Sequence, residues 1–155
     1  MKHEADAVDW ATLAVPPPTP TSSSLAYWAA AAAGRLELQR CGVCRRLASY
    51  PREICPYCWG KNLAWEVVSG HAHVQTFTRV HQVGHPGWRN AVPYVVALVR
   101  LVEGPVMLTQ LLAEERPLYV GATCRVAFTK VGDWTLPFFR LVDEPEPARL
   151  KAEAI

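Results

Sequence analysis

The sequence predicts a mainly β protein with one N-terminal helix, a four-cysteine metal-binding loop and a small five-stranded barrel. Two Cys-x-x-Cys pairs, separated by ten residues, occupy 41–58. β-Branched runs divided by glycine and proline turns then extend to residue 142. One alanine-rich stretch, 25–33, has the composition of a helix. No helix of bundle length is expected between the later runs, so strands should dominate the fold.

The composition indicates a packed domain without a strongly charged partner. Of the 155 residues, 50% are hydrophobic and 19% are charged, which suits one domain with a small appendage. The formal charge of +2 is too small to suggest binding to nucleic acid or to an anionic membrane. No apolar run reaches the ~18 residues of a membrane span, and the acidic start of the chain is unlike a secretory leader. We therefore expect a cytoplasmic protein that does not bind membranes.

The two ends of the chain are expected to be flexible tails. Residues 1–23 contain prolines at 16–18 and 20, which favour an extended and semi-rigid segment. Residues 143–155 are charged and also contain prolines, so they are expected to fray.

A docking helix is predicted over 24–35. Serines suited to N-capping precede the helix-forming residues, and a glycine follows them. Leu25, Trp28 and Ala32 would share one face, with Tyr27 beside it. A helix of this length is marginal alone. It should therefore dock, either on its own domain or on another subunit.

The four paired cysteines predict a metal cage within a unit over 36–68. The chain has five cysteines, which could instead form two disulfides and a free thiol, but the paired spacing and a reducing compartment favour a metal. Each Cys-x-x-Cys turn points two sulfurs at one point, and the intervening hairpin brings both turns face to face. Flanking strands are predicted at 35–40 and 63–68. The predicted ligands are Cys41, Cys44, Cys55 and Cys58.

Thiolate donors suit zinc or iron and exclude magnesium and calcium. Because protein would fill all four positions, no position stays open for water or substrate, and we expect one structural zinc per chain. The alternative is a redox dithiol in one pair, which the second pair at hairpin distance argues against.

The segment 69–142 is predicted to form a five-stranded Greek-key barrel of the OB type. Its strands follow one another at short spacing, with the turn 103–105 joining two of them as a hairpin. A β-sandwich is the structural alternative. The expected strands are 71–81, 94–102, 106–112, 124–130 and 138–142.

Outside the cysteine pairs, the sequence offers no convincing catalytic arrangement. His71 and His73 share a strand face by alternation, but no third ligand is apparent near them. His81 and His85 flank a glycine- and proline-containing loop of the kind that often carries function. Cys124 stands in an apolar strand and is interpreted as a buried small hydrophobe. We therefore expect a binding or accessory subunit rather than an enzyme.

Several segments, taken in order, resemble a known family. They are an aromatic pair in the helix, a run entering the first cysteine pair, and short motifs along the predicted barrel. The sequence closely resembles the acyl-CoA-associated OB-fold family, long described as a domain of unknown function, over about residues 24–142. The matching segments are YW at 27–28, GRLELQRC at 34–41, both cysteine pairs, SG at 69–70, TFT at 76–78, PYVVALV at 93–99, LVEG at 101–104 and LPFF at 136–139.

The resemblance implies a helix, a rubredoxin-like zinc ribbon and an OB barrel that serve as an accessory subunit. Members of the family bind thiolase-like enzymes, sterol-carrier-type thiolases or retro-aldolases acting on acyl-CoA, some in steroid or lipid catabolism. Others accompany hot-dog-fold enoyl-CoA hydratases. The partner supplies the chemistry, and the OB subunit is thought to shape its CoA channel. The family also has a glycine after the second cysteine of each pair, where this chain has Arg45 and Trp59.

The predicted contacts with a partner or a CoA thioester are mostly aromatic residues, because exposed aromatics often anchor interfaces. Each tryptophan among them could equally belong to the core. The candidates are Tyr27, Trp28, Trp59, His81, His85, Trp88 and Tyr94.

Two other functions are compatible with the residues. An OB barrel can bind single-stranded nucleic acid, for which several arginines after residue 78 could supply a basic groove. A four-cysteine loop that held iron could carry electrons, as rubredoxin does.

Overall fold

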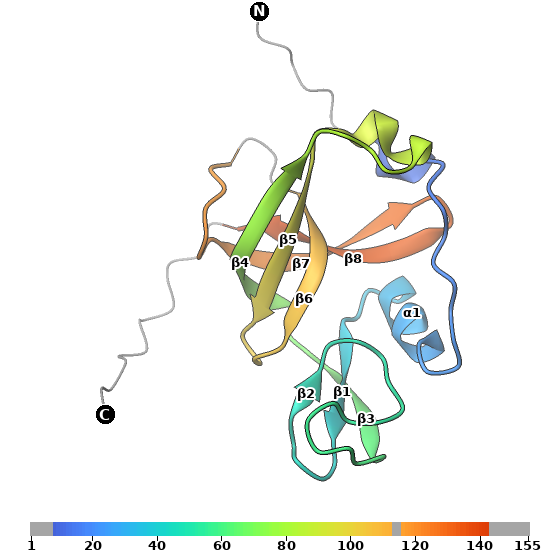
Figure 1. Cartoon of the computed structure of the whole chain (residues 1–155), viewed down its shortest axis with the longest axis vertical. Coiled ribbons are helices and arrows are strands. Elements are labelled where there is room, and N and C mark those ends of the chain that lie inside the picture. The colour runs from blue at the N-terminus through green and yellow to red at the C-terminus, as the bar shows by residue number, and fades with distance from the viewer. Residues whose placement is uncertain (1–7, 113–115, 143–155) are drawn as a thin grey trace, which may run out of the picture.

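The protein consists of a three-stranded ribbon joined to a closed five-stranded barrel (Figure 1). This computed structural model describes residues 8–112 and 116–142. The predicted fold class is confirmed, and the closed barrel excludes the alternative of a sandwich. The elements are η1 (Trp10–Thr12), α1 (Leu25–Ala32), β1 (Glu37–Cys41), β2 (Leu47–Ala48), β3 (Leu63–Val67), β4 (His71–Val80), η2 (Pro86–Ala91), β5 (Tyr94–Leu101), β6 (Val106–Leu112), β7 (Thr123–Val131) and β8 (Trp134–Leu141).

The ribbon is an antiparallel sheet with β1 between β2 and β3. β3 pairs with all of β1, whereas β2 pairs with only two of its residues. The buried Gln39 compensates for this short edge. Its side-chain amide donates to the Arg52 carbonyl at 2.9 Å and accepts from the Arg52 N–H at 2.7 Å. One side chain therefore fixes the loop between the two cysteine pairs, and both of its buried polar groups are satisfied.

The barrel closes in the order β4-β5-β6-β8-β7, with β4 also paired to β7. Only β6 and β8 run parallel, joined through the pairs Leu111↔Phe139 and Leu112↔Arg140. A register shift between Val74 and Thr76 bends β4, as a bulge does. This bend lets β4 pair with β7 at one end and with β5 along most of its length.

One continuous hydrophobic core joins the helix, the ribbon and the barrel. Its largest fully buried side chain is Phe139 on β8, and Val99 and Leu101 of β5 belong to the same cluster. Leu38 and Leu47 extend the cluster into the ribbon. The ribbon is therefore packed on the barrel as well as tethered to it.

α1 docks on its own chain, against β8 and β1. The predicted apolar face is wrong, because Leu25 is 59% exposed and Ala32 is also exposed. The buried face consists of Tyr27, Ala30 and Ala31. Two alanines let the helix axis approach the barrel closely, and Trp28 then meets the ring of Trp134 edge-on, with centroids 5.5 Å apart.

The described part of the predicted N-terminal tail, residues 8–23, differs from a free tail. Trp10 packs edge-on against Phe138 with centroids 5.3 Å apart, and Leu13 is 6% exposed. These two apolar side chains fix the segment on the barrel despite the prolines that follow them. Residues 1–7 and the predicted tail 143–155 lie outside the described residues.

The strand predictions hold within one or two residues, with one exception. β8 begins at Trp134, four residues before its predicted start, and continues through Pro137. Pro137 precedes the part of β8 that pairs with β6, so the strand is paired on one side there, where a proline is tolerated. η1, β2 and η2 were not predicted. No helix in the described ranges is long and apolar enough to cross a membrane.

Candidate metal centre

Each cysteine pair lies in a turn closed by the same two backbone hydrogen bonds. In the first turn, Arg45 N–H donates to the Cys41 carbonyl at 3.0 Å, and Cys41 N–H donates to the Arg46 carbonyl at 2.9 Å. In the second, Trp59 N–H donates to the Cys55 carbonyl at 3.0 Å, and Cys55 N–H donates to Gly60 at 2.9 Å. We call these turns knuckles. Their equivalence gives the two sulfur pairs the same local geometry.

The residue after each second cysteine adopts a left-handed backbone. Arg45 has φ 63° and Trp59 has φ 60°, and no other non-glycine residue in the described ranges has a positive φ. Such a conformation costs a non-glycine residue on the order of 1 kcal/mol. At both positions, the family that this sequence resembles has a glycine. The knuckle geometry is therefore retained here without glycine.

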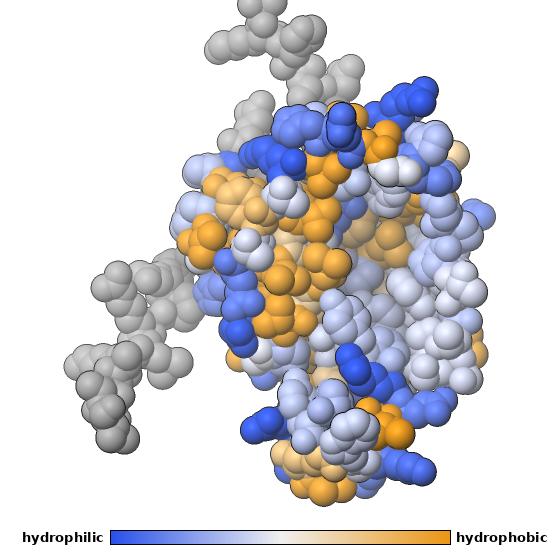
Figure 2. All heavy atoms as spheres, viewed as in Figure 1, coloured by the Kyte–Doolittle hydropathy of each residue, from blue (hydrophilic) through white to orange (hydrophobic). Residues whose placement is uncertain are grey.

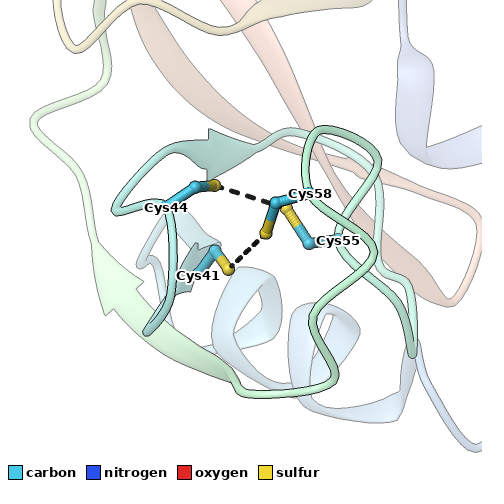
Figure 3. Close-up of side chains that lie close together, drawn as sticks. All are labelled: Cys41, Cys44, Cys55 and Cys58. Atoms are coloured by element: carbon cyan, nitrogen blue, oxygen red, sulfur yellow. Dashed lines mark hydrogen bonds between the residues drawn. The ribbon is translucent and has the colours of Figure 1, made fainter.

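The four knuckle sulfurs converge on one point (Figure 3). All four Sγ atoms lie within 4.8 Å of one another, with Cys41 and Cys58 at 3.6 Å and Cys44 and Cys55 at 3.7 Å. A tetrahedron with metal–sulfur bonds of about 2.3 Å has sulfur–sulfur edges of about 3.8 Å. The cage therefore has the dimensions and the donor set of a four-thiolate zinc site. Among the described residues, no other group of three histidine, cysteine or acidic side chains is close enough to hold a metal.

Backbone amides prepare some of these thiols to ionise. The Cys44 amide, with help from that of Val43, lowers the pKa of Cys41 to about 6 although burial opposes the shift. For Cys58 the Gly60 amide acts in the same direction, but burial and the neighbouring thiols outweigh it and raise the pKa to about 11. The Cys41 thiolate therefore forms readily, but each further thiolate in the cage would be repelled by it. A divalent cation would remove this repulsion.

An ion pair supports the knuckles from outside the cage. The Arg40 guanidinium binds both carboxylate oxygens of Glu66 across the β1–β3 pair, with Nη2–Oε1 at 2.7 Å, and donates to the Arg45 carbonyl at 2.6 Å. Arg40 lowers the pKa of the Glu66 carboxyl. Arg46 lies over the ring of Tyr57, 5.1 Å from its centroid, and so ties the first knuckle to the second.

The seven predicted partner contacts do not form one site. Tyr27 is buried in the core and Trp28 is half-buried against it, so Tyr27 is excluded as a surface contact. Trp59 is 80% exposed at the second knuckle. The remaining four lie at the end of β4, in and around η2, and at the start of β5, at the end of the barrel away from the ribbon (Figure 1). They are His81, His85, Trp88 and Tyr94.

The sequence reasoning missed a group of exposed apolar side chains beside Trp59. We call Trp59 and these neighbours the knuckle patch, and Figure 2 shows hydrophobic residues at the end of the ribbon. The sequence does contain a signal for this patch. Apolar residues lie inside a metal-binding loop that has almost no hydrophobic core in which to bury them. The other members are Val43, Ile54 and Tyr57, which are 65%, 40% and 48% exposed.

Comparison with known proteins agrees with this architecture. A family model described as the rubredoxin-like zinc ribbon domain of ChsH2 matches residues 28–64, and a model of the C-terminal OB-fold domain of ChsH2 matches residues 65–129. A solved structure titled "Ltp2-ChsH2(DUF35) aldolase" superposes with a TM-score of 0.71 at 30% identity, over 81% of this chain and 98% of that chain. The chain belongs to the ChsH2 family. The four-sulfur cage is thus part of a ChsH2-type ribbon, which supports a structural zinc.

Some curated relatives of this ChsH2-family chain are longer proteins that it matches over part of their length. A probable enoyl-CoA hydratase alpha subunit of Thermomonospora curvata is 34% identical over 125 residues, or 74% of this chain. The chain spans only 36% of that relative's length. A DUF35 domain-containing scaffold protein of Methanocaldococcus jannaschii is 31% identical over 94 residues, covering 59% of this chain and 66% of the relative. A Sulfolobus solfataricus protein of the DUF35 family, at 15% identity and a TM-score of 0.57, shares the fold.

Proposed function

We propose that the chain is an accessory subunit that binds and stabilises a thiolase-like enzyme or aldolase acting on acyl-CoA, and helps to shape its CoA channel. The observation that carries the proposal is the match to nearly the full length of a chain from the Ltp2-ChsH2 aldolase. Two relatives are described as scaffold proteins, which supports a non-catalytic role for this chain. A setting in steroid or lipid catabolism is part of the proposal. The hydratase-like relative favours a hot-dog-fold enoyl-CoA hydratase as the second candidate partner.

In this proposal zinc is a structural cofactor. The proposed ligands are Cys41, Cys44, Cys55 and Cys58, which leave no coordination position for a substrate. The ion would hold the two knuckles together and so fix the surface that they present.

The knuckle patch is the proposed main contact with the partner. Four of the eleven exposed large hydrophobic residues in the described ranges belong to this patch. Trp59 is the most exposed of them and is held in a left-handed backbone by the knuckle. Tryptophan buried at the centre of an interface often contributes most of the binding energy. Arg46, fixed over Tyr57, would add a positioned cation beside it.

The outer face of β5 and β6 is a second proposed contact. Leu98 and Leu108 lie opposite each other there, and Leu108 is 58% exposed. The Tyr50 hydroxyl accepts a hydrogen bond from Leu108 N–H at 3.3 Å, which links this face to the ribbon. His81 and His85 are exposed and are proposed, with Trp88 and Tyr94, to face the CoA thioester.

The test is affinity purification of the tagged full-length chain from its native cells, with mass spectrometry of bound proteins and metal analysis of the same sample. We expect a thiolase or aldolase, together with about one zinc per chain. A zinc-loaded chain that retains no enzyme, or only nucleic acid, contradicts the accessory function and favours an OB module for single strands.

A Trp59→Gly variant tests the contact surface separately. Glycine suits the left-handed backbone at this position, so the variant should keep its zinc and its fold. We expect recovery of the partner to fall about tenfold or more. Val120→Ala removes another exposed apolar side chain (64% exposed) and should leave recovery unchanged. Equal recovery with Trp59→Gly and wild type would reject the knuckle patch but not the accessory function.

A further inference from the structure

A groove of about 410 Å³ lies where the ribbon joins the barrel. Residues that follow α1, residues at and just after the end of β3, and three residues of β7 line it. Its volume falls in the range of small-molecule sites, about 300–1,000 Å³. The lining residues are Gly34, Arg35, Leu36, Val67, Val68, Ser69, Arg125, Val126 and Phe128.

The charged groups of this groove are both arginines. No carboxylate lines it, and the Glu103 carboxylate at the same junction accepts a hydrogen bond from the Ser69 N–H at 2.7 Å. Arg35 binds Glu37 only through Nε, at 3.0 Å, and its terminal amino groups have no hydrogen bond to any described residue. Arg125 has no ion pair or hydrogen bond from its side chain within the described ranges. Donors therefore remain on both guanidinium groups.

The strand register places a second arginine opposite Arg125. Arg125 on β7 lies directly opposite Arg140 on β8. Like charges in directly opposite positions destabilise a sheet. An anion bound next to Arg125 would offset this repulsion, and guanidinium groups bind carboxylates and phosphates in a bidentate geometry.

The rest of the groove is an apolar wall. Val126 and Phe128 on β7 are only partly covered by the core, and Val67 at the end of β3 is 59% exposed. A bare inorganic ion would leave this wall in water. A ligand with an apolar body would cover it and gain the free energy of that burial.

We propose that this groove binds a small organic anion, an apolar body that carries a phosphate or carboxylate group. The arginines hold the anionic group and the valine and phenylalanine side chains cover the body. The site belongs to the free chain and does not depend on the proposed partner enzyme.

The test is titration of the isotopically labelled full-length, zinc-loaded chain, followed by NMR. The probes are phenyl phosphate, benzoate, inorganic phosphate and benzyl alcohol. We expect phenyl phosphate or benzoate to shift the signals of Val67, Val126 and Phe128 saturably, with a Kd of about 1 mM or below. The better of the two identifies the anionic group. Inorganic phosphate and benzyl alcohol should each bind about tenfold more weakly.

Three variants make the proposal falsifiable. Arg125→Gln should weaken binding of the aromatic anion about tenfold, whereas Arg89→Gln, an exposed arginine in η2, should not. Val67→Ser should weaken the aromatic anion and leave inorganic phosphate unaffected. Equal binding of benzyl alcohol, equal binding of inorganic phosphate, insensitivity to Arg125→Gln, or no saturable shift would each overturn the proposal.

Discussion

Each strand of the barrel contributes buried hydrophobic side chains, whereas the ribbon buries few and exposes several. Between residues 37 and 67 the buried hydrophobic side chains are two leucines, one alanine and two cysteines. The core of the barrel contains buried valine, leucine, methionine and phenylalanine side chains. The two regions therefore depend on different sources of stability. The barrel depends on hydrophobic burial, and the ribbon depends on a metal cage that leaves its apolar side chains available for contact.

The largest expected effect is that of removing the metal. Metal binding contributes on the order of 10 kcal/mol to the folding of such sites, and the ribbon has little core to replace it. With a strong zinc chelator, we expect β1 and β3 to lose their protection from amide hydrogen exchange while β5 and β7 keep theirs. Exchange followed residue by residue by NMR measures both at once.

A matched pair of cysteine variants controls this experiment. Cys58→Ser should abolish zinc binding. Cys124→Ala should leave zinc stoichiometry unchanged, because Cys124 is buried in the barrel, where burial raises the pKa of its thiol to about 12. If the barrel strands also lose protection without zinc, the shared core makes the two regions one cooperative unit, and the contrast drawn above is wrong.

Truncation of the barrel core should give the next largest effect. Phe139 is fully buried at the point where β8 pairs with β6, so Phe139→Ala should lower the free energy of unfolding by about 3–5 kcal/mol. Zinc stoichiometry should stay the same. Denaturant unfolding with parallel metal analysis checks both. Leu108→Ala, at a position 58% exposed on β6, should cost about 0.5 kcal/mol or less, and a comparable loss in the two variants would contradict this account of the barrel.

The smallest effect concerns the helix that bridges the two regions. Burial, and next the nearby Tyr50, raise the pKa of Tyr27 from 10.0 to about 12. The phenol is neutral when protonated, so the unfolded chain loses this proton first. The contribution of the protonated Tyr27 to the free energy of unfolding is complete below pH 10. It is lost as the pH rises to about 12, and the loss is at most about 3 kcal/mol. Tyr27→Phe should remove this alkaline loss, measured by denaturant unfolding between pH 9 and 12, and an unchanged pH profile would reject it.

Local patterns predicted the features of the fold that depend on neighbours in sequence. Cysteine spacing predicted the cage, and β-branched runs predicted the strands, because each depends on residues a few positions apart. The buried face of α1 was mispredicted because β8, on which the helix packs, lies near the other end of the described chain. Trp10 and Leu13 were interpreted as tail residues for the same reason. Trp59 was predicted, but Val43, Ile54 and Tyr57 were missed, because their exposure, not their hydrophobicity, distinguishes them from core residues.

The packing of the N-terminal elements on β8 sets an order for folding during synthesis. The ribbon pairs entirely within residues 37–67, so it can form once that stretch has left the ribosome. Trp10 and Trp28 must wait for Phe138 and Trp134. The N-terminal segment leaves the ribosome early but packs on the barrel late, after about a hundred further residues have been translated. Until then α1 has no barrel to pack on, and its apolar face stays accessible to chaperones and proteases.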